Sequence, residues 1–88
     1  MFFLNTEDEK LYEYDESDVV AFRENITDRQ VVEVNGEFFI VTTHKGEGAM
    51  DYGEAVSEER AKRESILLGV DREKYENTFD IELEEVNK

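Results

Sequence analysis

Three carboxylates alternate with apolar residues near the end of the sequence: Asp80, Glu82 and Glu84. This alternation predicts a half-buried strand over about residues 77–85, with the carboxylates on one face. Successive carboxylates on such a face stand about 6.6 to 6.8 Å apart, twice the strand rise and close to two phosphate steps along one DNA strand. A rigid row with this spacing suits a groove lined by Lys and Arg. The alternative interpretation is an outward polar face that happens to be acidic.

Two further groups of carboxylates lie within the first eighteen residues. They are Glu7, Asp8 and Glu9 in a predicted loop, and Asp15, Glu16 and Asp18 before an apolar run. We expect both groups to extend the charge of the row and to speed association with a basic partner. The loop group also suggests a calcium site, but it lacks the ligand spacing and central Gly of an EF-hand, so we interpret it as a solvated acidic turn.

The most unusual feature of the composition is its large negative net charge. The 88 residues include 24 acidic and 10 basic ones, which gives a formal net charge of −14. Such a field repels nucleic acid and anionic membranes and attracts basic protein surfaces, although it also serves solubility alone. In size and charge the chain resembles phage-encoded DNA mimics, including anti-restriction and anti-CRISPR proteins, and also bacterial immunity proteins and barstar-like inhibitors. This resemblance is one of composition and covers no motif.

The residue types that usually carry catalysis are scarce. His44 is the only histidine, there is no Cys, and the two glycines that follow His44 do not form a phosphate-binding pattern. We therefore predict a protein that is not an enzyme and uses no cofactor and no metal. The absence of Cys and of a long apolar run predicts a location in the reducing cytoplasm.

The element that must organise these side chains is a hairpin over about residues 30–43. An Asn-Gly pair at 35 and 36 separates two β-branched and aromatic runs, which is the strongest short-range hairpin signal in a sequence. A type I′ turn there places apolar side chains on both faces of the hairpin. One face carries Val32, Val34, Phe39 and Val41, and the other carries Val31, Phe38 and Ile40. The second face needs a cover, so we predict self-association through Val31, Phe38 and Ile40.

Two helices are predicted beside the hairpin. The first covers about residues 18–24, because acidic capping residues precede an apolar run, although Val19 and Val20 leave a strand as the alternative. The second covers about residues 51–68, where an apolar stripe at helical spacing ends before Gly69, with Ser57 as a second possible start. Residues 1–4 and 10–14 are predicted to pair as short strands across the acidic loop.

Together these elements predict one small α+β domain over residues 1–88, with a mainly antiparallel sheet and two helices on one face. The predicted function is that of a non-catalytic acidic inhibitor or decoy that binds the basic nucleic-acid-binding surface of a partner protein. An example is a phage-encoded inhibitor of a host nuclease or DNA-binding protein. The alternative is a small assembly module that self-associates through its hairpin, and a calcium-dependent module is a third possibility.

Overall fold

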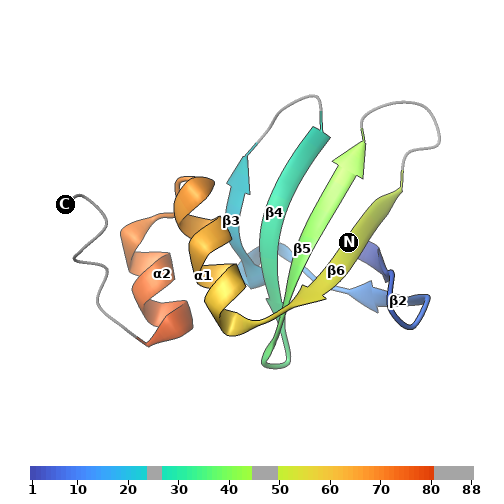
Figure 1. The fold of residues 1–88 in the computed structure, drawn as a ribbon, viewed down its shortest axis with the longest axis horizontal. Coiled ribbons are helices and arrows are strands. Elements are labelled where there is room, and N and C mark those ends of the chain that lie inside the picture. Colours follow the sequence, from blue (N-terminus) through green and yellow to red (C-terminus); the bar gives the residue numbers. More distant parts are fainter. Residues whose placement is uncertain (24–26, 45–49, 81–88) are drawn as a thin grey trace.

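A computed structural model describes residues 1–23, 27–44 and 50–80 of the chain (Figure 1). Its strands form one six-stranded sheet in the order β2-β1-β6-β5-β4-β3. The strands are β1 (Phe2–Asn5), β2 (Lys10–Glu13), β3 (Val19–Arg23), β4 (Thr27–Val34), β5 (Glu37–His44) and β6 (Asp51–Val56). The helical elements are η1 (Glu16–Asp18), α1 (Glu58–Leu67) and α2 (Arg72–Phe79). Only the β1–β6 pairing is parallel within this sheet, so the predicted α+β class with a mainly antiparallel sheet is confirmed.

The central hairpin has the predicted register. Val31 pairs with Ile40 and Val32 pairs with Phe39 along β4 and β5. Asn35 and Gly36 both have positive φ, 52° and 85°, which a type I′ turn requires. The strands of the predicted N-terminal pair, β1 and β2, are also antiparallel neighbours across the acidic loop. These local hairpins are the best-predicted parts of the fold.

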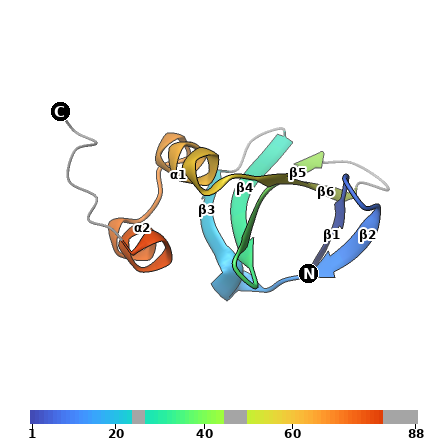
Figure 2. The ribbon, with the colours of Figure 1, turned by 60° about the horizontal axis from the view of Figure 1, so that its bottom comes forward.

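Both faces of the central hairpin are covered by the chain itself. The sheet curls so that the β1–β2 hairpin lies across from β4 and β5 (Figure 2), which encloses an inner cluster of side chains. The buried members of this inner cluster are Phe3, Tyr14, Val32, Phe39 and Val41. The outer face of β3, β4 and β5 is covered by α1 and, at β3, by α2. The buried members of this outer cluster are Val20, Ala21, Val31, Ala61, Leu68, Tyr75 and Phe79.

The structure removes the reason for predicting self-association through the second face of the hairpin. Val31 is fully buried and Ile40 is 3% exposed. The ring of Phe38 stacks on that of Phe79, with 5.2 Å between their centroids. The cover that the second apolar face needs is thus supplied by the helices of the same chain.

The helix predicted over residues 18–24 is wrong for its described part. Residues 19–23 form β3, which pairs with the outer edge of β4. The acidic residues before it cap a single 3₁₀ turn, η1, rather than an α-helix. The β-branched pair Val19 and Val20 suits the strand, and the open edge of β4 provides the hydrogen bonds that fix it there.

The helix predicted over residues 51–68 begins too early. Residues 51–56 form β6, which pairs with β5 and β1, and α1 starts only after Ser57. The hydroxyl oxygen of Ser57 accepts a hydrogen bond from the backbone N–H of Arg60, so Ser57 is the N-cap. The predicted end is confirmed, because Gly69 follows α1 with φ of 82°.

The strand predicted over residues 77–85 is wrong at its start. Residues 77–79 are the last residues of α2, whose N-cap is Asp71. Residues 81–85 lie outside the described part of the chain. In the part that is described, neither helix is long and apolar enough to cross a membrane.

Candidate functional site

The row of carboxylates predicted near the end of the chain has no counterpart in the described residues. Asp80 is the C-cap of α2, in a left-handed conformation with φ of 55°. Glu82 and Glu84 lie outside the described residues. Asp80 therefore ends a helix and does not belong to a strand, so the predicted carboxylate row is not supported at its first residue.

The turn between β1 and β2 holds the first acidic group at one end of the sheet's edge strand. The side chain of Asn5 accepts a hydrogen bond from the N–H of Glu7, at 2.9 Å. Asp8 accepts hydrogen bonds from the N–H of Lys10 and the hydroxyl of Tyr12, at 3.0 and 2.8 Å. Glu7, Asp8 and Glu9 are all exposed. The chain thus fixes the backbone of this turn while its carboxylates face solvent.

The second acidic group follows the other end of β2. The carboxylate of Asp15 accepts hydrogen bonds from the backbone N–H and the hydroxyl of Ser17, and that of Asp18 accepts one from the N–H of Asp15. The Ser17 hydroxyl, together with the backbone N–H groups of Ser17 and Asp18, lowers the pKa of Asp15. Glu16 is exposed at the start of η1. Both predicted groups of the first eighteen residues therefore lie at the ends of the same strand.

One acidic residue of this edge is missing from the sequence-based site. Glu13 is exposed at the end of β2, opposite Phe2 of β1. The alternation of Lys10 to Tyr14 is the signal that could have identified it, since it places Glu13 on an outward face. We call six exposed carboxylate residues the acidic edge: Glu7, Asp8, Glu9, Glu13, Asp15 and Glu16.

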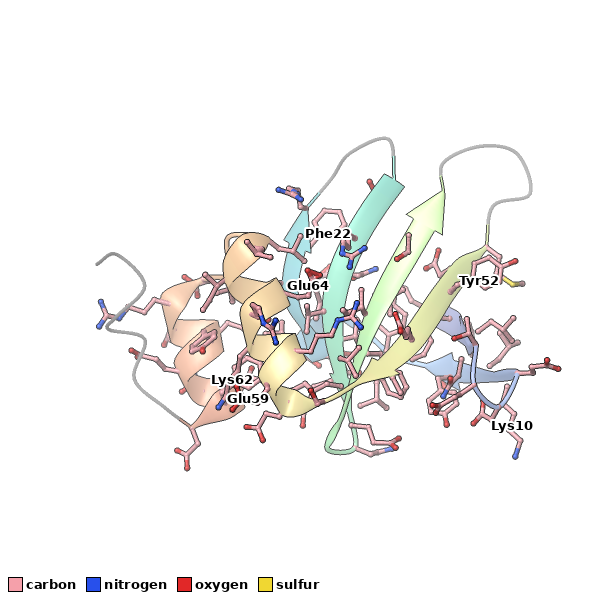
Figure 3. All side chains as sticks on the ribbon, in the orientation of Figure 1. Lys10, Phe22, Tyr52, Glu59, Lys62 and Glu64 are labelled. Carbon is pink, nitrogen blue, oxygen red and sulfur yellow. The ribbon has the colours of Figure 1, made fainter. Side chains whose placement is uncertain are left out.

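The acidic edge differs from the helical side in how its charge is compensated. In the helical layer and its sheet contacts, ion pairs join Lys62 to Glu58, Arg72 to Glu76, Arg60 to Glu54 and Arg29 to Glu64. No such pair involves the acidic edge among the described residues, and Lys10 is the only basic residue among positions 1–18. From α2, Lys74 donates a hydrogen bond to the carbonyl of Ser17, next to Glu16, at 2.7 Å. Figure 3 shows Lys10 directed away from the turn, whereas Glu59 and Lys62 lie side by side on α1. Among the described residues, six exposed carboxylates thus lie at the two ends of β2, with Lys10 and Lys74 as the neighbouring cations.

A half-buried polar cluster around the buried Tyr14 lies inside the curled sheet, and sequence reasoning did not identify it. The Tyr14 hydroxyl accepts a hydrogen bond from the Gln30 amide at 3.1 Å and faces the Asp51 carboxylate at 3.5 Å. Asp51 also accepts a hydrogen bond from the Thr43 hydroxyl, at 2.6 Å. Burial, followed by the nearby charge of Asp51, raises the pKa of Tyr14. The cluster ties β4, β5 and β6 to Tyr14, which lies between Glu13 and Asp15 of the acidic edge.

Tyr14→Phe tests this cluster through the pH dependence of stability. The pKa of Tyr14 is higher in the folded than in the unfolded chain, so the Tyr14 proton is held more tightly in the fold. This contribution to stability is complete below the ordinary pKa of 10.0 and is lost as the pH rises through the raised pKa of the folded state. We expect the free energy of unfolding of the parent, measured in urea, to fall between pH 9 and pH 11. The fall should be smaller in Tyr14→Phe, and an equal fall in both proteins would contradict the assignment.

Neither the described side chains nor comparison with known proteins assigns a metal or a family to this site. Within residues 1–23, 27–44 and 50–80, no three Asp, Glu or His side chains converge closely enough to hold a metal ion. The side chain of His44 is outside what the structure describes. Comparison with known proteins finds no matching family model, no matching curated protein and no matching solved structure.

Proposed function

We propose that the chain is a non-catalytic acidic protein that binds the basic nucleic-acid-binding surface of a partner protein and so acts as a decoy for nucleic acid. The observation that supports this proposal is the gathering of six exposed carboxylates at the acidic edge, none of which forms an ion pair with another described residue. The two acidic groups flank four residues of β2, a span of about 13 Å, or about four phosphate steps along one DNA strand. A groove that binds one DNA strand through Lys and Arg presents positive charges over the same distance.

The acidic edge replaces the predicted row as the binding surface in this proposal. At each end one carboxylate, Asp8 or Asp15, accepts hydrogen bonds from the nearby backbone, so little loop freedom is lost on binding. The target class is a nuclease or DNA-binding protein, and a phage origin and a cytoplasmic location belong to the same proposal.

Neutralising the turn tests the proposal directly. The variant Glu7→Gln, Asp8→Asn, Glu9→Gln removes three charges, and we expect it to lower affinity for a basic partner by about tenfold or more at low salt. The measurement is retention of lysate proteins on the immobilised chain. The parent should retain basic nucleic-acid-binding proteins that are released by high salt and also by excess double-stranded DNA, since DNA would compete for the same surface.

A matched variant separates the acidic edge from net charge. Glu58→Gln, Glu59→Gln, Glu73→Gln removes the same number of charges from the first turns of α1 and α2. It should retain the same proteins as the parent. If both variants lost retention of these proteins equally, overall charge and not the acidic edge would explain the binding. If excess DNA did not release the retained proteins, the decoy proposal would be ruled out.

A self-associating assembly module is the second candidate. The favouring observation is a group of exposed apolar side chains on β1, β2 and β6, distinct from the buried hairpin face. Light scattering at low and high salt tests it, because a dimer of this acidic chain should be favoured when salt screens the repulsion between copies.

A further inference from the structure

An exposed apolar surface lies on the outer face of the sheet beside the acidic edge. Leu4 of β1 pairs with Leu11 of β2 on one side and with Tyr52 of β6 on the other, so these three side chains form a row across the sheet. Phe2 lies two residues before Leu4 on the same face. The exposed fractions are 55% for Phe2, 61% for Leu11, 46% for Met50 and 44% for Tyr52. We call Phe2, Leu4, Leu11, Met50 and Tyr52 the apolar row.

The helices do not cover this part of the sheet. α1 packs on β3, β4 and β5, and α2 packs on α1 and β3, so both lie toward the β3 edge, as both ribbon views show (Figures 1 and 2). Figure 3 shows Tyr52 on β6, away from the helical layer. A shallow hollow of about 400 Å³ is lined by Phe2, Leu11, Met50 and Asp51. Contiguous apolar side chains around a hollow mark an interaction surface more often than scattered ones do.

Carboxylates bound the apolar row at both ends. Glu13 pairs with Phe2 and shares its face, while the turn acids Glu7 to Glu9 lie at the other end of the two strands. An apolar centre with a charged rim is the usual arrangement of a protein interface. The complementary surface must therefore be apolar in the middle and basic at its ends. A second copy of this chain would bring like charges together there, which disfavours a homodimer.

We propose that the apolar row binds an amphipathic basic segment of a partner protein, with its apolar side chains on Leu4, Leu11 and Tyr52 and its Lys or Arg residues on the acidic edge. This inference rests on the proposed function and deepens it, since it names the chemistry of the partner segment. Charge attracts the segment, and the apolar row selects among basic segments.

Two synthetic peptides of equal length and charge separate these two contributions. One has Lys residues at both ends and Leu residues in the middle, the other has Ser in place of each Leu, and fluorescence anisotropy measures their affinities for the full chain. We expect the parent to bind the Lys-Leu peptide about tenfold or more tightly than the Lys-Ser peptide. The variant Leu11→Ser, Tyr52→Ser should bind the Lys-Leu peptide no more tightly than the Lys-Ser peptide, with its affinity for the Lys-Ser peptide unchanged.

Leu67→Ser is the matched control, because Leu67 is 64% exposed on α1, close to the 61% of Leu11. It should leave both affinities unchanged. Equal affinity of the parent for the two peptides, or an equal effect of Leu67→Ser, would overturn the inference. A dimer that dissociates on Leu11→Ser, detected by light scattering, would also overturn it and assign the surface to a second copy.

The charge variant of the turn makes failure of the proposed function visible separately. Neutralising Glu7, Asp8 and Glu9 should weaken binding of both peptides, whereas the apolar variant weakens only one. If the Lys-Ser peptide bound the parent and the neutralised variant with equal affinity, the proposed function would fail. The inference about the apolar row would still stand if the parent bound the Lys-Leu peptide more tightly than the Lys-Ser peptide.

Discussion

Phe39→Ala should lower the free energy of unfolding by about 3 to 5 kcal/mol. Phe39 is fully buried at the centre of the inner cluster, with ring centroids 4.9 Å from Phe3 and 5.3 Å from Tyr12. Its truncation leaves a cavity between the curled halves of the sheet, where neither half can move without breaking strand pairs. A chain of this length has a total stability of about 4 to 13 kcal/mol, so the loss is a large fraction of the total and should lower the urea midpoint strongly. Urea unfolding followed by circular dichroism measures the change.

Phe22→Ala is the control for this prediction. Phe22 lies on β3 of the same sheet but is 49% exposed, and Figure 3 shows it near the end of that strand away from the hairpin turn. Its truncation should cost less than about 1 kcal/mol, because little apolar area returns to water and no enclosed cavity forms. Equal costs for the two substitutions would contradict the inner cluster.

The sequence-based prediction succeeded where the determining interactions are local. The Asn35-Gly36 turn sets its own φ values and thereby fixes the register of β4 and β5. The same holds for Gly69 at the end of α1. Its positive φ lets the N–H groups of Gly69 and Val70 donate hydrogen bonds to carbonyls of the last helical turn. Such features need no information about distant parts of the chain.

The errors arise where distant strands decide the local structure. Residues 51–56 carry an apolar pattern that continues the stripe of α1, yet they pair with β5 on one side and β1 on the other. Two open strand edges provide more hydrogen bonds to this segment than one extra helical turn would. Residues 19–23 are fixed in the same way by β4. A periodicity count within one window cannot detect these partners.

The candidate site was predicted in part for the same reason. The acidic groups of the first eighteen residues were identified from their composition, but their position at the two ends of one edge strand depends on the sheet order. The apolar row depends on the parallel pairing of β1 with β6, which joins Leu4 to Tyr52 across 48 positions of sequence. Asp80 was assigned to a strand because Asp80 to Glu84 alternate, while the Asp71 cap and the residues after it form α2.

Gly53 of β6 packs directly against the ring of Phe3, which leaves no room for a side chain at this position. Gly53 pairs with Asn5 of β1 and Val41 of β5, and the ring of Phe3 lies against its backbone. A Cβ at this position would lie 2.5 Å from Cε1 of Phe3 and nearer still to Cδ1. Phe3 is fully buried against Tyr12, Tyr14 and Phe39, so its ring has no free space to enter.

Gly53→Ala should therefore destabilise the fold by about 1 to 3 kcal/mol through overpacking, as measured by urea unfolding. The cause can be isolated with Phe3→Leu as a second substitution, because the smaller side chain makes room for the new methyl group. In that background Gly53→Ala should cost less than in the parent, a coupling of about 1 kcal/mol or more. Gly36→Ala is the control: its Cβ would meet nothing within 4 Å, and its cost arises from a φ of +85°. That cost should be the same with Phe3 or Leu at position 3, and an additive result for Gly53→Ala would place the Phe3 ring elsewhere.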